Sequence, residues 1–197
     1  MTGWRRFWLD LWGCFLIPAY TLLFAGAVEW FGTNFSVLAV TGPRNYRGFV
    51  LWGVLAGLYF LAVMWRIGGG MPRRLSGWGV RGLTLLGCFS LGGALMLPYL
   101  PQSWPKVASL HIFLAFFACV LVMLALLLAL RTLIRAGETA CRPLLRGWLA
   151  ITAGSAVLFL MGGMVTSALE VFFTISAVQL ARRLLLRVTD LEGGKSL

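Results

Sequence analysis

The chain has 197 residues, of which 60% are hydrophobic and only 12% are charged. A soluble domain carries about a quarter of its residues as charged side chains, so this composition excludes an ordinary soluble domain and indicates apolar side chains facing a lipid bilayer. The net charge of +11 does not indicate a nucleic-acid partner, because the basic residues lie at the ends of apolar segments, as membrane topology requires.

Six apolar segments approach the roughly 20 residues that a helix needs to cross about 30 Å of hydrocarbon. They predict an all-α, polytopic membrane protein with one six-helix transmembrane domain, residues 1–187. The expected spans are about 7–30, 49–65, 82–97, 108–130, 148–161 and 165–185. A short polar tail, 188–197, should follow in the cytoplasm and be disordered.

The links between these spans contain strong helix breakers. Residues 31–48 are too short for a domain but long enough for a structured cap, and a Gly68–Gly70 run ends the second span. Between the third and fourth spans, Pro98, Pro101 and Pro105 force the chain to turn. This turn brings His111, the sole histidine, to the first turn of the fourth span.

The last apolar block, residues 147–180, is long for one span and short for two. A reversal at Gly162 and Gly163 would make two spans and place both termini in the cytoplasm. The cytoplasmic side would then hold 14 basic residues, and the outer side only Arg44, Arg47 and Lys106. The 14 are Arg5, Arg6, Arg66, Arg73, Arg74, Arg81, Arg131, Arg135, Arg142, Arg146, Arg182, Arg183, Arg187 and Lys195. This positive-inside bias favours six spans over five.

Under this topology, polar side chains gather at the outer boundary of the membrane. The expected members of this outer cluster are Glu29, Asn34, Ser36, Tyr99, His111 and Glu170. Ionisable groups near hydrocarbon are costly to bury, so their grouping predicts either a ligand pocket or hydrogen bonds that join helices. No comparable group is expected in the inner half of the spans.

Glu170 allows the most specific prediction within the outer cluster. Thr166, Ser167 and Thr174 share its helical face, and His111 is its expected partner, because a carboxylate beside an imidazole would fix the imidazole tautomer. Two readings stay open here: a pocket for a headgroup, ion or proton, and a purely structural bond between the fourth and last spans.

A catalytic reading needs a nucleophile and a base. Ser36, His111 and a carboxylate, Glu29 or Glu170, are the residue types of a Ser–His–acid set, although no nucleophile-elbow motif is present. One histidine and four scattered cysteines supply too few ligands for a zinc site. We therefore expect no metal and no cofactor.

Three stretches carry a resemblance to a known family. They are NFSVLAVTGPRNYRGFVLWGVLAGLYFL, LHIFLAFFA and GMVTSALEVFFTISAVQL. In order and spacing the chain resembles the bacterial DUF-998 family of six-span proteins, related to the wider FRAG/DRAM/Sfk group. The resemblance implies the six-span fold and an outward-facing polar cluster. It implies no activity, although the eukaryotic relatives are associated with lipid-linked or membrane-organising roles.

These observations predict a multi-pass protein of the plasma (cytoplasmic) membrane. The favoured function is binding or handling of a lipid or small amphiphile in an outward-facing polar pocket. The first alternative is a non-catalytic scaffold that binds a protein partner through its transmembrane helices. The second is a membrane-embedded hydrolase or transferase that uses His111 with a carboxylate. Membrane lipids are the expected partners.

Overall fold

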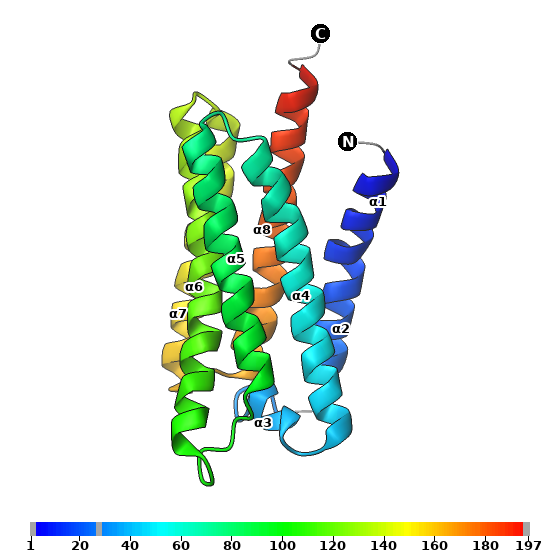
Figure 1. Cartoon of the computed structure of the whole chain (residues 1–197), viewed down its shortest axis with the longest axis vertical. Coiled ribbons are helices and arrows are strands. Elements are labelled where there is room, and N and C mark those ends of the chain that lie inside the picture. Colours follow the sequence, from blue (N-terminus) through cyan, green and yellow to red (C-terminus); the bar gives the residue numbers. More distant parts are fainter. Residues whose placement is uncertain (1–2, 27–28, 195–197) are drawn as a thin grey trace.

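The computed structural model describes residues 3–26 and 29–194, and the described part contains helices and no strand. The long helices run side by side in alternating directions (Figure 1). In chain order the elements are α1 (Gly3–Leu11), the π-helical turn η1 (Trp12–Leu16), α2 (Ile17–Ala25), α3 (Phe35–Ala39), α4 (Pro43–Gly69), α5 (Arg74–Met96), α6 (Pro105–Arg135), the 3-10 turn η2 (Thr139–Cys141), α7 (Arg142–Gly162) and α8 (Ser167–Gly194). The predicted all-α class is confirmed.

Among the described residues, five helical stretches are long and apolar enough to cross a membrane. They are Phe7–Ala25, Pro43–Gly69, Arg74–Met96, Pro105–Arg135 and Thr139–Gly162. Such helices make the chain an integral membrane protein with a polytopic helical bundle. α8 is longer than four of these five, but polar residues such as Glu170, Gln179 and Arg182 lower its hydropathy.

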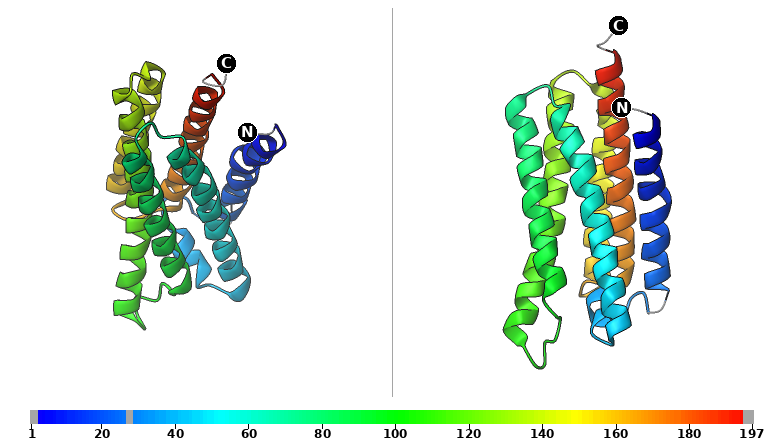
Figure 2. Two further views of the ribbon diagram at one scale, coloured as in Figure 1. Left: turned by 45° about the horizontal axis from the view of Figure 1, so that its top comes forward. Right: turned by 45° about the vertical axis from the view of Figure 1, so that its right-hand side comes forward.

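α8 nevertheless lies at the centre of the bundle. It packs against α2, α4, α6 and α7, and Figure 2 shows it beside the long helices along their length. Ala177, Val178 and Leu184 on α8 are completely buried in the main core. A helix that is buried by other helices needs less apolar surface than one that faces lipid, so its polar residues are available for contacts within the bundle.

The last apolar block forms two antiparallel helices, as the charge distribution predicts. α7 ends at Gly162, and Gly163 follows in the left-handed region with φ +63°, where a side chain would be strained. α8 then returns along α7, so α1 begins and α8 ends at the same end of the bundle (Figure 1). α8 continues to Gly194, so most of the predicted tail is helical; Lys195 lies outside the described residues.

Pro18 explains the irregular turn in the first helical stretch. In η1 the backbone N–H of Ile17 bonds the carbonyl oxygen of Trp12, five residues earlier. The next bond in this register would join residue 18 to the carbonyl of Gly13, but proline has no N–H to donate. The Gly13 carbonyl is therefore free to accept a hydrogen bond from another helix.

Candidate functional site

The outer cluster is organised around α3, a single short helix in the first outer link. Asn34 caps its N-terminus: the side-chain oxygen accepts a hydrogen bond from the N–H of Val37 at 2.9 Å. The other end of the same amide donates to the carbonyl oxygen of Val165, just before α8, at 3.2 Å. Asn34 is only 8% exposed, so one buried side chain both starts α3 and attaches it to the α7–α8 link.

Main-chain bonds join the segment before α3 to the N-terminus of α8. Ser167 donates its backbone N–H to the carbonyl of Thr33 at 2.7 Å, and Ala168 donates to the carbonyl of Trp30 at 2.9 Å. The first N–H groups of a helix have no partner within that helix. The outer link therefore caps α8, and this pairing fixes the position of the link.

Glu170 also binds this link. Its Oε2 accepts a hydrogen bond from the backbone N–H of Phe35 at 2.7 Å. Because the carboxylate holds the first residue of α3, its partner is the α3 main chain. The predicted direct pairing of Glu170 with His111 is wrong: no bond joins these two described residues, which hold α3 separately.

His111 binds α3 through Ser36. The Ser36 Oγ lies 2.8 Å from His111 Nε2, and His111 Nδ1 lies 2.9 Å from the carbonyl oxygens of both Ala94 and Leu97. Carbonyl oxygens only accept, so Nδ1 carries the hydrogen in the neutral imidazole and Nε2 accepts the serine hydroxyl proton. The end of α5 thus fixes the tautomer of a histidine that is 3% exposed.

Phe35 occupies the space between these polar contacts. Its side chain is completely buried, and its ring meets the rings of Phe24 and Trp52 edge to face, with centroids 5.1 and 5.0 Å apart. Leu95 and Val171 belong to the same apolar cluster. An aromatic side chain of α3 therefore fills an apolar hollow whose rim is formed by the polar groups of the outer cluster.

The two remaining predicted members lie at the edge of the cluster. The Tyr99 ring is 5.8 Å from the His111 ring, centroid to centroid, and partly buried. Glu29 is exposed, and its carboxylate lies over Gly32, where an added Cβ would be 2.7 Å from Oε2. The structure thus brings Asn34, Ser36, His111 and Glu170 together around α3 and leaves Glu29 on the surface.

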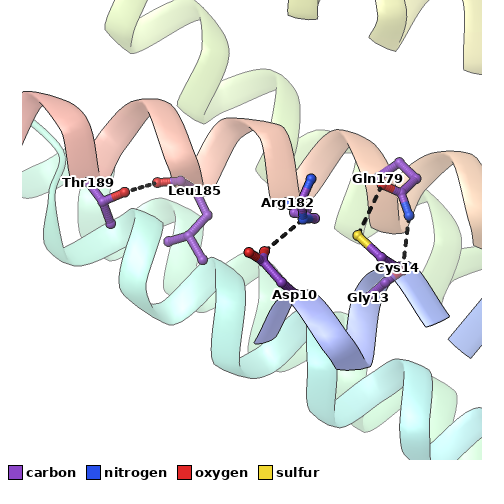
Figure 3. Close-up of polar contacts among 7 residues, drawn as sticks. All are labelled: Asp10, Gly13, Cys14, Gln179, Arg182, Leu185 and Thr189. Atoms are coloured by element: carbon purple, nitrogen blue, oxygen red, sulfur yellow. Dashed lines mark hydrogen bonds and ion pairs between the residues drawn. The ribbon is translucent and has the colours of Figure 1, made fainter. Parts of the chain in front are cut away.

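A second polar group lies in the inner half of the bundle, where the sequence predicted none, so that prediction is wrong. Figure 3 shows Asp10 of α1 paired with Arg182 of α8, the Asp10 Oδ1 and Arg182 Nε being 2.7 Å apart. Gln179 Nε2 donates to the Gly13 carbonyl at 3.0 Å, and Cys14 Sγ donates to Gln179 Oε1 at 4.0 Å. Gln179 thereby satisfies the carbonyl that Pro18 leaves free. The spacing of Gln179 and Arg182, three residues apart on one helical face, was the available signal.

Tyr59 of α4 borders this inner group. It is completely buried, and its hydroxyl has no hydrogen-bond partner among the described residues. An added Cβ on Gly13 would meet this hydroxyl and would lie 2.7 Å from the ring carbon Cζ. Glycine at position 13 is therefore what lets the first helical stretch approach α4 so closely.

Comparisons with known protein families, with curated proteins and with solved structures find no match to this chain. The resemblance to the DUF-998 family therefore stays a prediction.

Proposed function

We propose that this protein is a six-span protein of the cytoplasmic membrane, with both termini inside, that binds a lipid or small amphiphile at its outer end. The observation that carries the proposal is the buried Phe35 ring inside an aromatic hollow with a polar rim. In the closed state α3 fills the site, and the ligand binds when α3 withdraws.

The hollow has the chemistry that an amphiphile requires. Its walls are aromatic and aliphatic, and ligand sites combine such walls with a few placed polar groups. The rim offers a hydroxyl, an imidazole, an amide and a carboxylate, from Ser36, His111, Asn34 and Glu170. An acyl chain would take the place of the Phe35 ring, and a polar headgroup would take the place of the α3 main chain.

Opening α3 is energetically feasible. It breaks three hydrogen bonds to other elements, at Asn34, Ser36 and the Phe35 N–H, and it takes the buried Phe35 ring out of its apolar cluster, which costs about 1.5–3 kcal/mol. Interhelical hydrogen bonds in membranes average about 0.6 kcal/mol each. A cost of a few kcal/mol leaves a minor open state that a ligand can select.

The test uses purified protein in nanodiscs and a photoreactive lysophospholipid, with the crosslinked peptides mapped by mass spectrometry. Phe35→Ala empties the hollow and should raise labelling of the Phe49 to Trp52 stretch and of the first turns of α8. Phe89→Ala is the matched control, because the Phe89 side chain of α5 is 76% exposed. It should leave the labelling of both segments unchanged.

A triple variant, compared with two probes, distinguishes a site with a polar rim from a cavity that binds any apolar molecule. Adding Glu170→Gln and His111→Phe to Phe35→Ala should return lysophospholipid labelling to the wild-type level while labelling by a photoreactive alkane stays high. If Phe35→Ala labels no more than Phe89→Ala, or if the rim changes leave lysophospholipid labelling unaltered, the proposal is refuted.

A second candidate function follows from the Ser36–His111 contact. A nucleophile within hydrogen-bond reach of a base, itself oriented by a third group, is the arrangement of covalent acyl transfer, and here two carbonyl oxygens replace the usual carboxylate. Nε2 would take the Ser36 proton as Oγ attacks an ester carbonyl. It would then return that proton to the departing alcohol, leaving an acyl-serine for water to hydrolyse.

A fluorophosphonate probe distinguishes this candidate. Catalysis requires labelling of wild type at Ser36, loss of labelling in Ser36→Ala, and loss in His111→Gln with the protein still folded. Absence of labelling at Ser36 in wild type and in Phe35→Ala excludes it. If both functions fail, the remaining reading is a scaffold in which the outer cluster only fixes the fold.

A further inference from the structure

A cleft of about 480 Å³ opens between the start of α7 and the end of α8, at the end of the bundle opposite α3. Figure 2 shows both segments at the end of the bundle where α1 begins and α8 ends. Pro143 and Leu144 form one wall, and Leu186 contributes to the other. Its volume is in the range of small-molecule sites, and Ala140, Pro143, Leu144 and Leu186 supply its apolar lining.

Two arginines of α8 border this cleft. Arg183 and Arg187 are one helical turn apart on the same face, so their guanidinium groups point toward the same region. Both are exposed, and neither forms an ion pair with a described residue. The adjacent Arg182 differs, because it is paired with Asp10.

The charge balance of the cleft is positive. Asp190 is the one acidic residue in the lining, and it stands one turn beyond Arg187 toward the end of α8. Arg142, exposed at the first residue of α7, adds a further positive charge next to Pro143. An anion between α7 and α8 would therefore meet one carboxylate and two guanidinium groups that have no ion-pair partner among the described residues.

We infer that this cleft binds an anionic phospholipid of the inner leaflet; the inference rests on the proposed orientation of the chain but not on ligand binding at the outer end. Arginine forks bind phosphate oxygens in a bidentate manner, and Arg183 and Arg187 would hold the phosphate. The acyl chains would run past Leu144 toward the hydrocarbon region, where Gly147 of α7 faces Leu180 of α8. Basic clefts between transmembrane helices on the cytoplasmic side bind anionic headgroups in this way.

The test measures retained lipid by native mass spectrometry after delipidation and titration with phosphatidylglycerol or with phosphatidylcholine of the same chains. Wild type should retain phosphatidylglycerol selectively. The double variant Arg183→Gln/Arg187→Gln should weaken that binding about tenfold or more, since each basic side chain near the surface contributes to anionic-lipid affinity.

Two further variants separate a site from general charge attraction. Arg73→Gln/Arg74→Gln removes the same charge from two exposed arginines, just before α5 and at its first residue, at the same end of the bundle and should leave retention unchanged. Leu186→Trp keeps every charge, narrows the cleft and should lower retention. Equal loss in the two double variants, or unchanged retention in Arg183→Gln/Arg187→Gln or in Leu186→Trp, would overturn the inference.

Discussion

The close approach of η1 to α4 gives the most exacting test of the packing. Substituting Gly13→Ala places a Cβ against the Tyr59 hydroxyl, 2.7 Å from Cζ and 2.9 Å from Cε2. Tyr59 is completely buried in the main core and cannot swing outward. Overpacking of this kind costs about 1–3 kcal/mol, so we expect the free energy of unfolding to fall by that amount.

Tyr59→Phe supplies the second arm of a double-mutant cycle. It removes the atom nearest to the added methyl group, and the hydroxyl has no partner among the described residues. Loss of an unpaired buried hydroxyl should be neutral or slightly stabilising. The double variant Gly13→Ala/Tyr59→Phe should therefore recover part of the loss, giving a favourable coupling of about 1 kcal/mol.

Gly82→Ala is the matched control for this cycle. Gly82 lies within α5, and an added Cβ there has no atom within 4 Å. Replacing a helical glycine by alanine in open space stabilises by about 0.5–1 kcal/mol. Unfolding in mixed micelles titrated with a denaturing detergent measures all four variants. If Gly13→Ala proves as stable as Gly82→Ala, position 13 does not pack closely against Tyr59.

Three further substitutions test the polar contacts. Gln179→Leu leaves the Gly13 carbonyl unpaired in the membrane and should lower the unfolding free energy by about 0.6–1.7 kcal/mol, the range of measured interhelical bonds; an unchanged midpoint would contradict the contact. Asp10→Asn weakens a partly exposed ion pair and should cost at most about 1 kcal/mol, with no added loss when combined with Arg182→Gln. Asn34→Ala removes the cap of α3, worth about 1 kcal/mol, and should speed hydrogen exchange in residues 35–39 while leaving exchange in α6 unaffected. Equal exchange of residues 35–39 in Asn34→Ala and in the wild type would refute the capping role.

The membrane-spanning helices could be predicted because their signal is local. A run of apolar residues identifies a helix in lipid without knowledge of its neighbours. The distribution of basic residues then predicts which end of each helix faces the cytoplasm. Gly162 and Gly163 could be recognised as a reversal for the same reason. The bundle and the two-helix division of residues 147–180 followed from these signals.

The partners of the polar side chains could not be predicted in the same way. Glu170 and His111 lie at one end of the bundle, and a direct pairing of the two leaves out the main chain of the outer link. That link contains a five-residue helix, α3, too short for a periodic pattern, and its N–H groups supply the partner of Glu170. Phe35, an apolar residue within a polar link, was the available indication that part of the link enters the bundle.

The inner polar group was missed for a related reason. Asp10 near the start of a span looks like a topology feature, and Gln179 in an apolar helix has no visible partner in the sequence. The contact depends on the irregular η1 turn, which Pro18 makes necessary, and on the exposure of one carbonyl to α8. Such a partner is defined only by the arrangement of two distant helices.

The two polar groups have a common consequence for how the bundle can move. Both attach the first 39 residues to α8, at the inner end through Asp10 and Gly13 and at the outer end through the segment before α3. A hydrogen bond between the side chains of Ser36 and His111 joins α3 to α6. The α3–α6 boundary thus carries fewer polar ties than the α3–α8 boundary. If α3 opens, we expect it to separate from α6 first, exposing the Ser36–His111 pair and the Phe35 hollow together, which places ligand entry and any chemistry at the same boundary.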